Sequence, residues 1–349
     1  MSKKYLSLFK YELKKLIWLY GAMILFFILY ISNESIITAN EANSLLTIND
    51  YTYITFNILN PKIYFFYIAF VAIMVYIQFN DGFNKLWHSL PFKNIDVIGV
   101  KLIVGIITLL LFFTVVAISK ITIYFDYADI YKLNLAVANI DPSIISPLFI
   151  IKEVITIFAV YIAIYFFTVL CQYIIGNCIS GIVFAGLFIS IPTLIISAFN
   201  ITANLTYNNL FAICPYFYDL SVNITNNISD TFVNDYIFNL ANYEIDLSIF
   251  LRFNNFAIVY YGIIAIVTLL ILLKISTNHN WIEQSSPFNK KWVSNIFKIV
   301  FIIDFAVIGT NFTYNSTFDK IILAIVFAII GLLVSSIIVK KQGVSKWKN

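Results

Sequence analysis

Few side chains in this sequence could do catalytic or metal chemistry. The chain holds two histidines, His88 and His279, and three cysteines, Cys171, Cys178 and Cys214. Their spacing matches no metal-binding or disulfide pattern, and catalytic sites need several titratable groups close together. The glycine-rich loop with which P-loop proteins hold phosphates is also missing from the sequence. We therefore expect that this chain is not an enzyme and binds no ATP, metal ion or other cofactor itself.

The strongest pattern lies between residues 79 and 101 and suggests contact with another protein. One side of a predicted helix carries apolar residues at offsets of three, four and seven, namely Phe83, Leu86, Trp87 and Leu90. Asp81 favours the start of this helix and Pro91 ends it, and Asn94 then caps the next helix. The pattern predicts a short amphipathic helix, residues 80–93, between two long apolar runs.

The polar residues of the same segment suit a protein interface. Lys85, His88 and Ser89 lie close to Trp87 in the sequence, and large aromatic side chains are typical anchors of interfaces. Because His279 is the only other histidine, we interpret His88 as a contact residue rather than a metal ligand. The alternative is an amphipathic segment that rests on lipid headgroups.

The elements that must position this segment are strongly apolar. Of 349 residues, 61% are hydrophobic and 11% are charged, and the mean hydropathy is +0.88. A soluble domain of this size cannot bury so much apolar surface. The pattern predicts an all-α, polytopic membrane protein with about eight transmembrane helices. The predicted spans are residues 16–31, 63–79, 97–118, 148–170, 180–199, 256–273, 296–310 and 321–339.

Residues 1–15 form a predicted amphipathic helix at the membrane interface. One helical face carries apolar side chains, namely Leu6, Phe9, Leu13 and Leu16. Lysines lie on or beside the other face, at Lys3, Lys4, Lys10 and Lys14. The alternative is a positively charged flank of the first span, without a defined helix of its own.

The distribution of charge predicts the orientation. The long loop 200–255 holds acids and Arg252, whereas most of the 22 Lys and Arg residues lie in residues 1–15, 80–101, 274–295 and 340–349. Basic segments next to membrane spans stay in the cytoplasm. We therefore expect a multi-pass protein of the bacterial plasma membrane, with both termini in the cytoplasm. The segment 80–93, the linker and the basic tail would lie on the same side, and loop 200–255 would be extracellular.

The run from Trp87 to Phe92, read as Trp-His-Ser-Leu-Pro-Phe and followed by Lys101, resembles the HSLP segment of ABC-2 type transporter permeases. It resembles most the Gram-positive permeases for antimicrobial peptides and phenol-soluble modulins. In that family the segment is a coupling helix that docks on a separate ATPase subunit. After the proline, the family's segment usually continues with Ser or Thr and then Arg. Here Lys93 keeps one basic residue, and the amide of Asn94 replaces the hydroxyl. The resemblance implies that the ATPase-coupling residues are Phe83, Lys85, Leu86, Trp87, His88, Ser89, Leu90 and Pro91.

The resemblance also implies an architecture and a function. Residues 16–273 would form the six-span core of the family, and residues 296–339 two additional spans. The implied function is that of the membrane subunit of an ATP-driven exporter of amphipathic, antimicrobial or toxin peptides. Its implied partners are two copies of an ATPase, which carries ATP and Mg, and a second permease chain, identical or homologous. Two alternatives stay open: a membrane-bound peptide sensor or immunity protein, and a membrane enzyme acting on lipid-linked substrates.

Asp304 lies inside the apolar run of residues 296–310. An ionised acid inside a membrane helix is costly, so its side chain should face protein or water. Two interpretations stay open for Asp304: a polar contact in a transport path, and a structural role as a hydrogen bond between helices or a protonated carboxyl.

Overall fold

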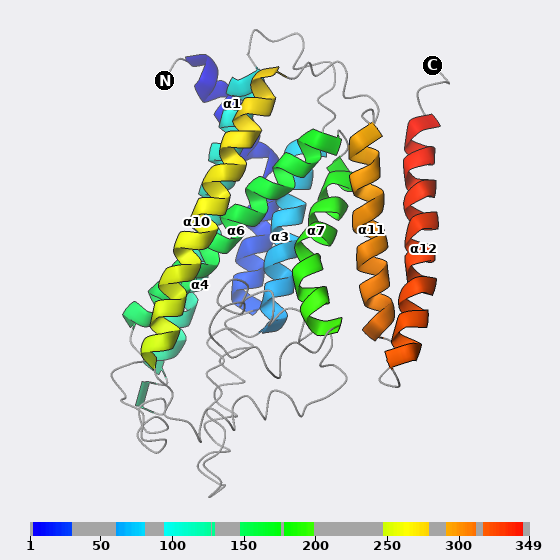
Figure 1. Ribbon diagram of the computed structural model, residues 1–349. Coiled ribbons are helices and arrows are strands. Elements are labelled where there is room, and N and C mark those ends of the chain that lie inside the picture. Colours follow the sequence, from blue (N-terminus) through cyan, green and yellow to red (C-terminus); the bar gives the residue numbers. More distant parts are fainter. Residues whose placement is uncertain are drawn as a thin grey trace, which may run out of the picture. The chain divides into compact units, whose positions relative to one another are not determined.

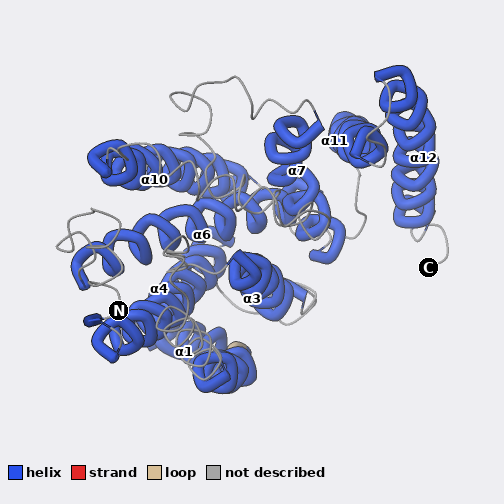
Figure 2. Tube along the Cα trace, turned by 90° about the horizontal axis from the view of Figure 1, so that it is seen from below, coloured by secondary structure: helices blue, strands red, loops and turns tan. Residues whose placement is uncertain are grey.

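The structure is a computed structural model that describes residues 3–29, 61–80, 94–126, 128–129, 147–175, 178–198, 247–278, 291–311 and 317–344. Within these residues every regular element is a helix (Figure 1, Figure 2), which confirms the predicted all-α class. The helices are α1 (Lys3–Lys15), α3 (Pro61–Asn80), α4 (Asn94–Asp126), α6 (Pro147–Ile175), α7 (Cys178–Ala198), α10 (Leu247–Asn278), α11 (Lys291–Asn311) and α12 (Thr317–Val344). A further apolar helix, Ile17–Leu29, follows α1.

Five of the described helices are long and apolar enough to cross a membrane. They cover Ile95–Asp126, Ile150–Ile175, Ile258–Thr277, Trp292–Thr310 and Phe318–Lys340. Shorter apolar helices lie at the other predicted spans, at Ile17–Leu29, Tyr67–Asn80 and Cys178–Ile189. Five of the eight predicted spans thus coincide with helices that could cross a membrane, and the chain has the make-up of a multi-pass membrane protein. The count of eight stays a prediction.

Several helices continue beyond the apolar runs that predicted them. α10 begins at Leu247, so helical backbone precedes the predicted span 256–273 and enters the predicted loop 200–255. α11 begins at Lys291, inside the predicted linker 274–295. Hydropathy marks only the part of a helix that suits lipid, whereas the ladder of backbone hydrogen bonds can continue into polar sequence. The helices therefore extend past the predicted spans 256–273 and 296–310, while their apolar parts, Ile258–Thr277 and Trp292–Thr310, lie close to those spans.

The described residues group into two compact units, each considered by itself. In the first unit, α4 from Val100 onward contacts helix Ile17–Leu29 and the part of α6 that ends at Ile162. Phe113 of α4 approaches Phe158 and Tyr161 of α6, with ring centroids 6.0 and 5.6 Å apart. On the other side, Phe112 and Phe26 lie 6.1 Å apart between ring centroids. α4 is therefore the helix around which this unit packs.

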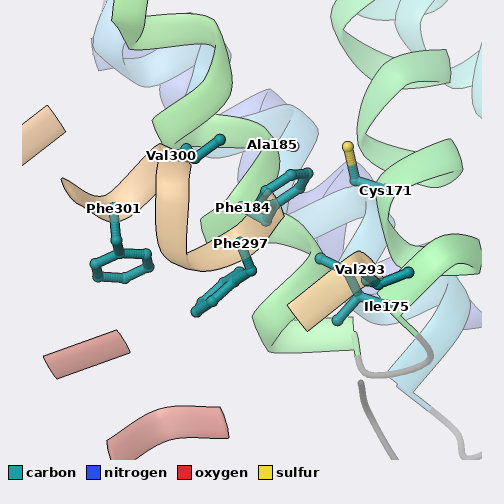
Figure 3. Close-up of a cluster of buried hydrophobic side chains, with 8 residues drawn as sticks. All are labelled: Cys171, Ile175, Phe184, Ala185, Val293, Phe297, Val300 and Phe301. Carbon is teal, nitrogen blue, oxygen red and sulfur yellow. The ribbon is translucent and has the colours of Figure 1, made fainter. Parts of the chain in front are cut away.

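The second unit contains a cluster of buried apolar side chains from α6, α7 and α11 (Figure 3). Its members are Cys171, Ile175, Phe184, Ala185, Val293, Phe297, Val300 and Phe301. The ring of Phe297 stacks on Phe184 with centroids 5.8 Å apart and approaches Phe301 at 4.8 Å. Val334 and Ile338 of α12 pack against the same cluster. The cluster therefore joins four helices of this unit.

Candidate functional site

The predicted ATPase-coupling residues lie outside the described residues. These are Phe83, Lys85, Leu86, Trp87, His88, Ser89, Leu90 and Pro91. What the structure describes is the helix on each side of them: α3, which ends at Asn80, and α4, which begins at Asn94. The candidate site is therefore built from the contacts that hold these two helices.

The last turns of α3 are fastened to α6 and α7. The Tyr165 hydroxyl donates a hydrogen bond of 2.9 Å to Oε1 of Gln78, and both side chains are fully buried. The ring of Phe79 meets Tyr173 edge to face, with centroids 6.4 Å apart. A buried hydrogen bond between helices resists separation because its groups would otherwise lose their partners in lipid. The end of α3 thus belongs to the packed part of the second unit.

Neighbouring contacts fix the directions of the helices in this unit. α6 and α7 are antiparallel, because a Cβ on Gly181 would lie 2.5 Å from Gln172 Cα, whereas Phe167 pairs with Phe188 at 5.3 Å between centroids. The Cys178 thiol, at the start of α7, donates to the Val75 carbonyl at 3.9 Å. The ends of α3 and α6 and the beginning of α7 therefore lie at one end of the unit.

The α11–α12 pair has the same kind of arrangement. A Cβ on Gly331 would lie 2.8 Å from the Phe301 carbonyl oxygen, and one on Gly309 would lie 2.7 Å from the Leu323 carbonyl oxygen. As residue numbers rise along α11 they fall along α12, so the two helices are antiparallel. Because the first turns of α11 join the cluster of Figure 3, the beginning of α11 and the end of α12 lie at the end where α3 terminates.

The first turns of α4 are fastened by a buried charge pair. Lys101 Nζ lies 2.9 Å from Glu12 Oε1 of α1, and Lys15 Nζ lies 3.9 Å from the same oxygen. Glu12 is 0% exposed and Lys101 is 1% exposed. The sequence analysis used Lys101 only as a cytoplasmic base and as part of the HSLP resemblance, and it did not predict a partner for Glu12. The available signal was that Glu12 is the single acid among the lysines of residues 1–15.

Two further contacts show how the N-terminal helices run along α4. The hydroxyls of Tyr20 and Thr108 are 2.9 Å apart and share a hydrogen bond, and Phe26 approaches Phe112. The later residue of helix Ile17–Leu29 thus contacts the later residue of α4, so the two helices run parallel. In the first unit, α1 consequently lies at the end where α4 begins.

The protein-facing side of α1 differs from the predicted apolar stripe. Leu8, Glu12 and Leu16 are buried, whereas Leu6 is 45% exposed and Leu13 is only partly covered. The predicted apolar face was chosen from apolar residues alone. The face that packs against the protein contains the acid Glu12, and it was therefore not predicted. An acid can occupy a packed face when a base on the neighbouring helix compensates its charge.

Asp304 lies in α11 with no exposed surface. Its helix packs against α7 and α12, and the buried Phe301 is one turn away. This burial agrees with the expectation that an acid in an apolar helix avoids lipid. Either interpretation of its role, path contact or helix contact, is compatible with this position.

The residues that the structure describes contain no group of three or more His, Cys, Asp or Glu side chains placed to hold a metal ion.

Comparison of the chain with models of protein families, with curated proteins and with solved structures found no match.

Proposed function

We propose that this chain is the membrane subunit of an ATP-driven exporter of the ABC-2 type. The observation that carries the proposal is the run from Trp87 to Phe92, which resembles the coupling helix of these permeases. In this proposal residues 80–93 dock on a separate ATPase, which binds ATP and Mg. ATP-driven movement of that subunit then shifts α3 and α4.

The contacts of α3 and α4 support such a transfer of movement. A docked segment passes on a push only when the helices on both sides of it are fastened to others. Gln78 of α3 is held by Tyr165, and Lys101 of α4 is held by Glu12. Movement of the segment between them would therefore reach helices of both units.

The proposal includes an orientation in the bacterial plasma membrane, with both termini and residues 80–93 in the cytoplasm. The helix ends that lie together within each unit support it, and so do the lysine-rich segments. Cysteines introduced one at a time at positions 85 and 230 of a chain without its native cysteines test it. An impermeant reagent added to intact cells should label position 230 and not position 85. The reverse result would contradict the orientation.

The partners and the cargo follow from the same resemblance. The transport path would form with a second permease chain, identical or homologous, and the cargo would be amphipathic peptides such as antimicrobial or toxin peptides. Asp304 would offer a polar group to this path or to a neighbouring helix. Asp304→Asn separates the two roles: lower export at unchanged thermal stability indicates the path, and lower thermal stability indicates a helix contact.

The docking step is tested by Trp87→Ala and Leu86→Asp, measured by co-purification with the ATPase and by transport-linked ATP hydrolysis. Truncation of an interface anchor costs about 2 kcal/mol, which is roughly a thirtyfold loss of affinity. The matched control is Trp292→Ala, because Trp292 is exposed at the start of α11. The control should assemble normally, at equal membrane levels of all three variants.

The same measurements also distinguish an exporter subunit from a sensor or immunity protein and from a membrane enzyme. Normal assembly and hydrolysis in both variants would contradict the docking role of residues 80–93. A chain that binds peptide but purifies without any ATPase would instead be a sensor or immunity protein. Turnover of a lipid-linked substrate by the purified chain alone would identify an enzyme.

A further inference from the structure

We infer that the buried Glu12–Lys101 pair sets the orientation of α1, by holding the helix break at Leu16 against α4. The inference concerns this chain alone and does not depend on the proposed function. Glu12 lies one turn before the break and Tyr20 lies one turn after it. Both residues are bonded to α4, to Lys101 and Thr108 respectively.

The break itself needs a cause outside the local sequence. α1 ends at Lys15, Leu16 is a turn residue, and helix Ile17–Leu29 then begins. The Leu16 amide donates to the Leu13 carbonyl at 3.1 Å, which is the tighter hydrogen bonding of an interrupted helix. Sharp breaks usually occur at proline or at glycine–serine pairs, and residues 13–17 contain neither. The residues one turn before and one turn after Leu16 both contact α4, and we attribute the break to these contacts.

Among the contacts of α1, the charge pair is the one that restricts the direction of the helix axis. Leu8 and Leu16 are buried on the same side of α1, but apolar burial is non-directional and permits several angles. A carboxylate and an ammonium group removed from water are costly unless they meet each other closely. With Glu12 and Lys101 both buried, α1 is restricted to orientations that keep the two groups together.

The opposite side of α1 stays accessible. Lys10 and Lys14 are exposed there, two residues before and after Glu12 along the helix. Fastening one side of α1 to α4 therefore fixes where its basic side points. Movement of the first turns of α4 would carry this basic side with it.

The test measures the distance between spin labels on α1 and α4 in a cysteine-replaced chain held in nanodiscs. The labels replace Lys10 and Thr122, both of which are exposed. A helix rises about 1.5 Å per residue, so position 122 lies roughly 30 Å along α4 from Lys101, within reach of pulsed electron resonance. The parent chain should give one narrow distance distribution.

The decisive variant is the double neutral change, Glu12→Gln with Lys101→Met. It removes both charges together, and such replacements usually leave a protein folded. We expect a broad distribution with a second component, whereas the control Lys14→Met should keep the narrow one. Leu8→Ala, which trims the apolar contact and spares the pair, should also keep it. A double neutral variant as narrow as the parent, or broadening by Leu8→Ala alone, would overturn the inference.

Discussion

The α1–α4 contact and the α11–α12 contact are both buried, yet different chemistry holds them. The first rests on the Glu12–Lys101 pair, and the next helix, Ile17–Leu29, adds the hydrogen bond between the hydroxyls of Tyr20 and Thr108. The second rests on close backbone approach at Gly309 and Gly331. Lipid is as apolar as a leucine side chain, so membrane helices associate through close packing and polar contacts rather than through apolar burial. The two regions use one of these means each.

The difference teaches which changes each region should tolerate. The α1–α4 contact should respond to loss of a charge and tolerate small changes of volume. The α11–α12 contact should respond to a single added methyl group at Gly309 or Gly331. Three changes test this contrast, and a fourth, Tyr165→Phe, tests the hydrogen bond between α3 and α6. Each is measured by thermal denaturation of the purified chain in one detergent.

The largest effect is expected for Lys101→Met. It leaves the Glu12 carboxylate buried beside Lys15 alone, and removing one partner of a buried pair costs about 3–5 kcal/mol. Glu12→Gln with Lys101→Met should cost less, because the buried carboxylate is then removed together with its nearest base, and Lys15 loses only a contact of 3.9 Å. Lys152→Met is the control, since Lys152 is exposed on α6. A Lys101→Met chain as stable as this control would remove the contrast between the two regions.

Gly331→Ala should come next. Its new Cβ would lie 2.8 Å from the Phe301 carbonyl oxygen and 2.9 Å from Phe305 Cβ, so α11 and α12 must separate slightly. Overpacking of this kind costs about 1–3 kcal/mol. Gly186→Ala is the matched control in α7, because a Cβ there meets nothing within 4 Å. Equal stability of the two variants would show that close approach does not hold the pair.

Tyr165→Phe should have a smaller effect. It removes the hydroxyl that donates to Gln78 and leaves a buried amide oxygen without that donor. The expected loss is about 1–2 kcal/mol, within the range for a buried polar group that loses its partner. Gln78→Leu combined with Tyr165→Phe should recover part of this loss. Failure of the second change to restore stability would show that the hydrogen bond is not what joins α3 to α6.

The smallest effect is expected for Tyr20→Phe. The bond between Tyr20 and Thr108 is only part-buried, and Thr108 also donates to the Val104 carbonyl at 2.8 Å. Hydrogen bonds between membrane helices contribute about 0.6 kcal/mol on average, and Tyr20→Phe should cost that much or less. If Tyr20→Phe cost more than Lys101→Met, hydroxyls rather than charges would hold the two N-terminal helices, α1 and Ile17–Leu29, against α4.

Much of the fold could be predicted from the order of residues. Apolar runs such as residues 97–118 and 321–339 predicted helices that α4 and α12 confirm, because backbone polar groups in lipid must be satisfied within the segment itself. The full length of each helix could not be predicted in this way, because α10 already begins at Leu247, before its apolar span. Hydropathy reports the preference of side chains for lipid, and it does not report where hydrogen bonding along the backbone stops.

The candidate site also has features that the sequence predicts and contacts that it does not predict. The sequence alone determined the helical class, the apolar spans and the amphipathic pattern from Phe83 to Leu90, since each depends on residue types at local spacing. Only the tertiary structure decided that Glu12 meets Lys101 and that Gln78 meets Tyr165. These partners lie far apart along the chain, and a polar residue in an apolar helix has many possible partners until packing selects one. Packing, and not composition, therefore determined which helices α3 and α4 are fastened to.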